Sequence, residues 1–207
     1  MPNPFKPTAG AIPPRLAGRS DMLDEFAESL DDGPGAPARL SRFTGARGVG
    51  KTVMLAEIRD IVLQRGWVSL SETATPGLVE RLSDSVTREI GRLGTSAPAR
   101  KRIQGITLPS VLGVGGGGLE FSPEPKPTIE LRQLLTTLVD VLESNETGLL
   151  VTIDEIHRSA LDGLRTITTV YQHLVTEGRN VALAFAGLPS AVSDLLSDNV
   201  LTFLRRA

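Results

Sequence analysis

The stretch Gly45-Ala-Arg-Gly-Val-Gly-Lys-Thr52 decides the fold. It fits the pattern G-x-x-x-x-G-K-[ST] of a phosphate-binding loop. Glycines allow the backbone to curl until successive N–H groups face one anion, and the start of the following helix also favours negative charge. Lys51 would then place its cation on the β- and γ-phosphates, and the Thr52 hydroxyl is a hard oxygen ligand suited to Mg²⁺. The alternative is a glycine-rich turn beside a surface lysine.

The loop therefore predicts a contiguous nucleotide-binding site. The residues expected to contact ATP are Gly45, Ala46, Arg47, Gly48, Val49, Gly50, Lys51, Thr52 and Val53. Lys51 is also expected to act in catalysis, because its charge would lie on the phosphate that is transferred.

The sequence around the loop alternates between strand and helix patterns. A short strand pattern precedes the loop at 40–44, and a helical pattern follows it at 51–65 and ends at Gly66. This alternation is typical of an α/β domain with a parallel sheet. The other expected strands are 67–70, 149–153 and 181–186, and the other expected helices are 20–30, 77–93, 129–144, 160–177 and 189–197.

The composition excludes several classes of protein. The chain has 207 residues, 40% of them hydrophobic and 22% charged, which is close to a globular average and unlike a disordered or fibrous chain. The absence of cysteine excludes disulfides and thiolate metal sites, and only two histidines argue against a histidine metal site. A net charge of −2 gives no broad positive field for nucleic acid or membranes, although a local basic patch stays possible.

No membrane segment or secretory signal is expected. The longest apolar runs are the length of a strand, well below the roughly 18 residues that a spanning helix needs. The N-terminus has prolines and no apolar core. We therefore expect a cytoplasmic protein, which the lack of cysteine also favours.

A second motif follows the apolar run Leu149–Ile153, which ends in Asp154 and Glu155. Asp154 can hold Mg²⁺ through water, and Glu155 can orient and deprotonate the attacking water. The alternative is that both acids cap the next helix. His157 could contact the γ-phosphate, but a surface or packing role is the better interpretation.

The chain is expected to have two parts of unequal size. Residues 1–17 form an arm, with five prolines in the first 15 residues, and residues 18–207 form the core domain. Within the core, 94–127 carries a glycine run and a proline run and is expected to be an insert that is peripheral to catalysis. It could contain a hairpin of 103–108 against 119–122, or be mobile.

These motifs resemble a known family. The stretch Phe43–Thr52, the pair Asp154-Glu155 and the phrase Ala186-Gly-Leu-Pro189 resemble bacterial AAA-type ATP-binding proteins. They are similar to the origin-recognition-like branch of the AAA+ ATPases and to its relatives among the signalling NTPases. The resemblance covers roughly residues 12–207. It implies a P-loop NTPase three-layer sandwich whose parallel sheet has the order 5-1-4-3-2.

The resemblance also implies two sites near the ends of the chain. Ile12 and Pro13, with Leu16 and Arg19 nearby, match the segment that packs on adenine in this family; the alternative is an arm that covers the sheet edge. Arg205 and Arg206 fall where such proteins carry an arginine finger that completes a neighbour's site, which would make them contacts for self-association. The alternative is the basic end of a helix.

The sequence also departs from the family. The fourth strand should end in a polar sensor residue, but it ends Ala184-Phe-Ala-Gly-Leu-Pro189, and Ser190 is the nearest substitute. The helical lid is expected to be absent or truncated at Ala207, so that partner chains or a longer product would supply it.

Together these features predict an ATP- and Mg²⁺-binding ATPase core that hydrolyses ATP slowly to drive or signal a conformational change. A nucleotide switch or scaffold without hydrolysis is the main alternative, and a small-molecule phosphotransferase is a weaker one. A protein or DNA partner stays open.

Overall fold

The computed structural model describes residues 20–96 and 127–190. Its centre is a sheet of four parallel strands, β1 (Leu40–Thr44), β2 (Val68–Thr73), β3 (Leu149–Ile156) and β4 (Val181–Gly187), in the spatial order β1-β4-β3-β2. The middle strands β3 and β4 are buried almost throughout, as expected for parallel strands that are covered on both faces.

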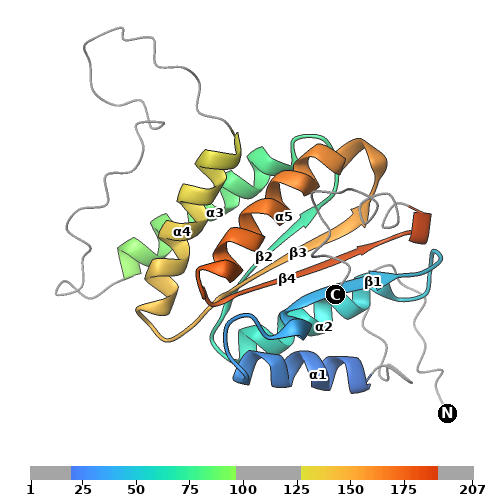
Figure 1. Ribbon diagram of the computed structural model, residues 1–207, viewed down its shortest axis with the longest axis horizontal. Helices are drawn as coiled ribbons and strands as arrows, with labels where there is room; N and C mark the ends of the chain where they lie inside the picture. The colour runs from blue at the N-terminus through green and yellow to red at the C-terminus, as the bar shows by residue number, and fades with distance from the viewer. Residues whose placement is uncertain (1–19, 97–126, 191–207) are drawn as a thin grey trace, which may run out of the picture.

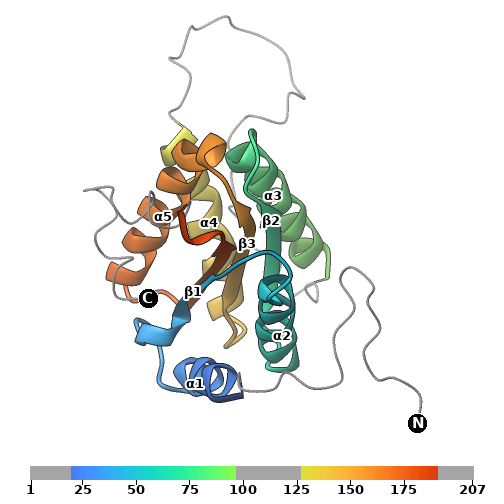
Figure 2. The same ribbon diagram turned by 90° about the vertical axis from the view of Figure 1, so that its right-hand side faces the viewer.

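Helices cover the sheet on both faces and make three layers (Figures 1 and 2). On one face lie α1 (Ser20–Asp31) and α2 (Lys51–Gln64); on the other lie α3 (Leu78–Ser96), α4 (Pro127–Glu143) and α5 (Leu161–Thr176). Two short 3-10 helices, η1 (Pro37–Arg39) and η2 (Arg158–Ala160), precede β1 and α5.

The two faces of the sheet have separate apolar cores. In β4, Leu183 and Phe185 pack with the α3–α5 layer, whereas three alanines pack with α1 and α2. Small side chains on that face leave room for α2 to lie close to the sheet. These alanines are Ala182, Ala184 and Ala186.

The expected fold class is confirmed: an α/β P-loop NTPase sandwich with a parallel sheet. The observed order agrees with the expected 5-1-4-3-2 for strands 1 to 4, and a fifth strand is not among the described residues. The arm at 1–17, the contacts Ile12 and Pro13, the insert residues 97–126 and the arginines Arg205 and Arg206 also lie outside the described residues, as does Arg19.

Three strands end later than expected, and β4 does so by a single residue, at Gly187. β2 continues to Thr73 through the polar residues Ser71 and Glu72, and β3 continues through both acids to Ile156. Apolar runs end before the strands do, because backbone pairing with a neighbour does not require an apolar side chain. Trp67, expected to begin a strand, instead precedes β2, and its N–H donates to the carbonyl of Val62.

Candidate nucleotide site

The loop 45–50 connects β1 to α2 at the carboxyl edge of the sheet. Gly48 and Gly50 have φ of +79° and +84°, a conformation that other residues rarely adopt. A Cβ on Gly45 would lie 2.8 Å from Cγ2 of Val49. All three glycines of the motif are therefore needed for the loop to curl back on itself.

The loop ends at the N-terminus of α2, which has Gly50 as its N-cap and no side-chain capping hydrogen bond. The first N–H groups of a helix have no acceptor within the helix, and the helix dipole places partial positive charge there. With no side chain capping it, this helix start is suited to an anion.

Lys51 connects the two ends of the loop. Its ammonium donates to the carbonyl of Gly45 at 2.9 Å and to that of Ala46 at 2.8 Å. The cation therefore lies against the same loop whose glycines form the curl.

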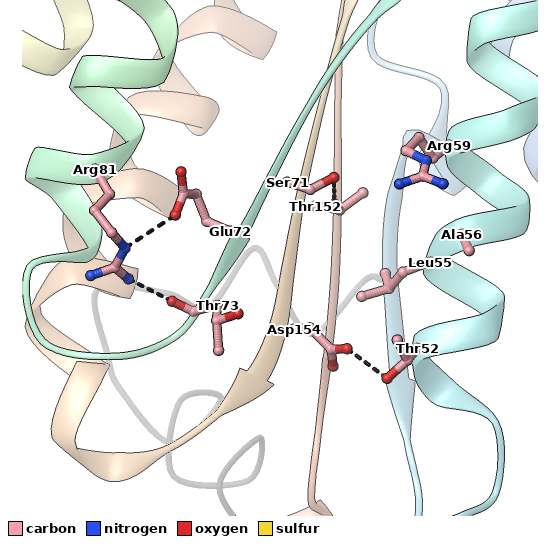
Figure 3. A pocket seen from close by; sticks show the side chains of 10 residues that line it. All are labelled: Thr52, Leu55, Ala56, Arg59, Ser71, Glu72, Thr73, Arg81, Thr152 and Asp154. Atoms are coloured by element: carbon pink, nitrogen blue, oxygen red, sulfur yellow. Dashed lines mark hydrogen bonds and ion pairs between the residues drawn. The ribbon is translucent and has the colours of Figure 1, made fainter. Parts of the chain in front are cut away.

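Thr52 and Asp154 come together from different elements. Thr52 Oγ1 on α2 donates to Oδ2 of Asp154 on β3 at 2.6 Å, although the two residues are 102 positions apart (Figure 3). Asp154 is held further by its other oxygen, Oδ1, which accepts the N–H of Glu155 at 2.7 Å, and by its carbonyl, which accepts the N–H of Ala74 at 2.8 Å. The arrangement brings two hard oxygen donors together beside the loop 45–50.

Glu155 has an unusual backbone. Its φ is +54°, and the register of β3 against β4 shifts between Ile153 and Ile156. Ile156 pairs again with Gly187, so the irregularity is confined to the two acids. Both Glu155 and the nearby His157 are exposed.

The carboxyl end of β4 carries no polar side chain in this structure. Gly187 pairs with Thr44 of β1 and with Ile156 of β3, and the residues after it are Leu188, Pro189 and Ser190. Ser190 is exposed.

A polar cavity of about 300 Å³ adjoins Thr52 and Asp154, and sequence reasoning did not identify its other walls. The alternation of Ser69, Ser71 and Thr73 with Leu70 and Glu72 was the signal that could have indicated a polar strip on one face of β2. The remaining lining residues are Leu55, Ala56, Arg59, Ser71, Glu72, Thr73, Arg81 and Thr152.

The described residues contain neither a cluster of metal-ligating side chains nor a helix that could span a membrane. No group of three or more histidine, aspartate or glutamate side chains in 20–96 and 127–190 is arranged to hold a metal ion. No helix in that part of the chain is both long enough and apolar enough to cross a membrane.

Residues 15–183 match the sequence profile of the AAA ATPase domain. The chain belongs to this AAA ATPase family. It therefore contains an ATP-binding AAA core, and the expected resemblance to AAA-type P-loop proteins is confirmed. No curated protein sequence matches the chain at a significant level.

A solved structure with a TM-score above 0.5 supports the fold, and two others show weaker similarity. Cdc6p from Pyrobaculum aerophilum has a TM-score of 0.52 and 17% identity, over 95% of this chain and 46% of that one. Orc1 from Aeropyrum pernix, solved in complex with DNA, has a TM-score of 0.47 and 17% identity over 93% and 44%. A chain of the HORMA:CdnC:Trip13 complex of E. coli MS115-1 has a TM-score of 0.39 and 13% identity over 92% and 73%. This chain thus spans less than half the length of the first two proteins.

Proposed function

We propose that this AAA core binds ATP together with Mg²⁺ and hydrolyses the terminal phosphoanhydride bond slowly. The observation that carries the proposal is the contact between Thr52 and Asp154 beside the curled loop. A hydroxyl and a carboxylate oxygen are the ligand types that Mg²⁺ prefers. Bound Mg²⁺ would neutralise charge that develops on the β- and γ-phosphate oxygens.

The chain's own residues have distinct roles in this proposal. The N–H groups of 45–52 and the ammonium of Lys51 bind the phosphates, with Val53 in the first turn of the helix. Thr52 and Asp154 hold the metal. Glu155, which is exposed at the carboxyl edge of the sheet, accepts a proton from the attacking water in this proposal.

A second candidate function is a nucleotide-dependent switch without hydrolysis. The observation that favours it is the end of β4, which presents Gly187 and Leu188 where relatives are expected to carry a polar residue that senses the γ-phosphate. Without that polar contact, ATP would bind and the transition state would gain less stabilisation.

The partners of the cycle are also proposals. Arg205 and Arg206 are our candidates for completing the nucleotide site of a neighbouring copy. Ile12 and Pro13 are our candidates for contacting adenine. We also propose that the protein acts in the cytoplasm. The DNA in the Orc1 structure makes DNA a partner to test, alongside protein.

The test separates binding from turnover. Titration calorimetry should detect ATP binding to the parent chain and none to Lys51→Ala, because the loop loses its cation. Single-turnover hydrolysis should fall by about 100-fold or more in Glu155→Gln, the range for loss of a general base, with ATP binding retained.

Glu146→Gln is the matched control, since Glu146 is also exposed and also has a positive φ, of +57°. It should change neither quantity. Unchanged ATP affinity in Lys51→Ala would overturn the site. ATP binding by the parent chain without single-turnover hydrolysis would favour the switch.

A further inference from the structure

The polar cavity that adjoins Thr52 and Asp154, the two proposed metal ligands, is distinct from the loop 45–50. Its walls come from α2, the carboxyl half of β2, the end of β3 and Arg81 of α3 (Figure 3). Thr52 and Asp154 form one wall, but residues 45–51 and Glu155 do not line it. A ligand here would contact the two proposed metal ligands from outside the triphosphate site.

The carboxylates of this cavity already have partners. Glu72 accepts from Arg81 Nε at 3.2 Å and from the hydroxyl of Ser85 at 3.1 Å. Asp154 accepts from Thr52 and from the N–H of Glu155. The guanidinium of Arg81 also donates to the carbonyls of Thr73 and Pro76 and to the hydroxyl of Thr75. Most of the acceptors and one of the two cations are therefore engaged.

The donors that remain lie on facing walls. Thr152 and Ser71 share one hydrogen bond at 2.9 Å, which leaves one hydroxyl proton of the pair to donate elsewhere. The Thr73 hydroxyl makes no hydrogen bond within the described residues, and Thr73 is exposed. Arg59 Nε lies 3.6 Å from Oδ1 of its neighbour Asp60, an ion pair that is too long to be a hydrogen bond. The Arg59 side chain is 46% exposed.

A further polar group, the hydroxyl of Ser69, lies on the same face of β2 and is buried. Its oxygen has no hydrogen-bond partner among the described residues. β2 is the edge strand of the described sheet, and Ser71 and Thr73 on this face are exposed, so their hydroxyls are accessible to a ligand from solvent. The strip therefore presents accessible hydroxyls next to a buried one that lacks a partner among the described residues.

We propose that this cavity is a second ligand site, which binds the oxyanion group of a small molecule, either a phosphate monoester or a carboxylate. The guanidinium of Arg59 supplies the charge, and the hydroxyls of Ser71 and Thr73 supply neutral donors. Guanidinium groups match the geometry of both oxyanions, and a volume of about 300 Å³ is at the small end of ligand pockets.

Occupancy of this site should affect the nucleotide site, and this part of the inference rests on the proposed function. A divalent cation held by Thr52 and Asp154 would attract an oxyanion in the adjoining cavity, since opposite charges favour each other at short range. Binding is reciprocal, so each ligand should tighten the other.

The experiment titrates inorganic phosphate, by calorimetry, into the full chain saturated with ADP and Mg²⁺, and separately into nucleotide-free Lys51→Ala. One phosphate site should appear in both arms. Arg59→Gln should weaken it by about 10-fold or more in each, the effect of losing a charge-assisted hydrogen bond. Arg165→Gln is the matched control: its side chain is 47% exposed on α5, away from the cavity, and should leave phosphate affinity unchanged.

Further arms identify the ligand class and separate the two proposals. Malonate in place of phosphate tells whether carboxylates bind. No phosphate or malonate site in either arm, or a site that Arg59→Gln leaves unchanged, would overturn the inference. Because the Lys51→Ala arm contains no nucleotide, phosphate binding there would stand even if the ATPase proposal failed. Equal phosphate affinity with and without Mg²⁺ in the ADP arm would overturn only the coupling.

Discussion

Glu155 joins a proposed catalytic role to a backbone that glutamate seldom adopts. Among the non-glycine residues of the described segments, only Glu155 and Glu146 have a positive φ. Such a conformation costs on the order of 1 kcal/mol or more, and persists where the surrounding structure fixes it. Here the carboxylate of Asp154 holds the Glu155 N–H, and Ile156 returns to register with Gly187. Strain and proposed chemistry therefore coincide at one residue.

This coincidence leads to our first prediction, for Glu155→Asn. Asparagine tolerates the left-handed region, so the free energy of unfolding should rise by up to about 1 kcal/mol. Hydrolysis should fall by about 100-fold or more, because an amide cannot act as the base. Urea denaturation and single-turnover hydrolysis measure the two effects.

Glu146→Asn is the matched control, since Glu146 shares the conformation and lies after α4. It should stabilise the fold to a similar degree without loss of hydrolysis. If Glu155→Asn destabilised the chain while Glu146→Asn stabilised it, the glutamate side chain rather than its backbone would be important for folding.

Single residues differ in how well the sequence foretold them. The loop glycines, Lys51, Thr52 and Asp154 follow from motifs whose spacing dictates their place, and the contact of Thr52 with Asp154 agrees with that expectation. Arg59, Ser71 and Thr73 have no motif, because a cavity between a helix and a strand depends on how the two pack. The left-handed φ of Glu155 could not be predicted from the sequence either, since it accompanies the shift in how β3 pairs with β4.

At the scale of elements, one side chain fixes the connection between β2 and α3. Arg81 reaches back from α3 to the carbonyls of Thr73 and Pro76 and to the hydroxyl of Thr75, and pairs with Glu72. The same connection carries the Ala74 N–H that donates to the carbonyl of Asp154. Arg81 thus supports the backbone of a proposed metal ligand without lining the loop.

Our second prediction is that Arg81→Ala loosens this connection. We expect a loss of about 1–2 kcal/mol of stability, at the lower end for several hydrogen bonds because the side chain is 39% exposed. The amide of Ala74 should also exchange with solvent faster, as measured by hydrogen exchange with mass spectrometry.

Arg88→Ala is the control on the same helix, because Arg88 donates a hydrogen bond to the hydroxyl of Ser85 and does not reach the connection between β2 and α3. Its effect on stability and on Ala74 exchange should be small. Equal effects of the two substitutions would show that the contacts of Arg81 contribute little to holding the connection.

The elements themselves were largely predictable, for physical reasons that also explain the errors. Apolar periodicity located the described α-helices and strands, because burial of one face imposes it, but it did not indicate the 3-10 helices η1 and η2. The strand ends were missed at β2 and β3, where Ser71–Thr73 and Asp154–Ile156 continue the ladder with polar side chains. Paired backbone, rather than apolar content, decides where a strand ends.

At the scale of the whole molecule, the strand order could not be derived from the pattern alone. Alternating strands and helices imply a parallel sheet, but several orders satisfy that pattern. The order came from the family resemblance, and β1-β4-β3-β2 agrees with it.

The need for glycine at buried position 148 could not be predicted from the sequence either. A Cβ there would lie 2.6 Å from the carbonyl oxygen of Asn180 and 2.8 Å from the ring of Trp67, contacts that only the folded sheet creates.

At the amino edge of the sheet, the buried side chain of Arg39 connects the end of α1 to the start of β4. Arg39 donates to the carbonyls of Ser29 and Leu30 at the end of α1 and to Oδ1 of Asn180 before β4. Its guanidinium lies 5.1 Å from the ring centroid of Trp67, and its carbonyl accepts the hydroxyl of Tyr171 on α5 at 3.3 Å. The cluster connects helices from both faces of the sheet. Substitutions that break this cluster should therefore lower the stability of the whole domain and not only that of a single helix.

Our third prediction follows from Tyr171, the single tyrosine of the chain. Burial raises the pKa of its phenol well above the usual value, and the nearby charge of Arg39 only partly offsets this. The unfolded chain would release that proton near pH 10, while the folded chain would keep it to higher pH. The contribution to stability is therefore constant below about pH 10 and is lost above it, by up to about 1.4 kcal/mol per pH unit.

Tyr171→Phe isolates this effect, because phenylalanine has no proton to release. The variant should be less stable at neutral pH by about 1 kcal/mol, the typical value of one hydrogen bond. Above about pH 10 its free energy of unfolding should fall less steeply than that of the parent, since one raised pKa has been removed. Urea denaturation across the alkaline range measures both slopes, and tyrosinate absorbance follows the single phenol directly. Parallel slopes, or a phenol that ionises at its ordinary pH in the folded chain, would mean that α5 does not seal this edge of the sheet.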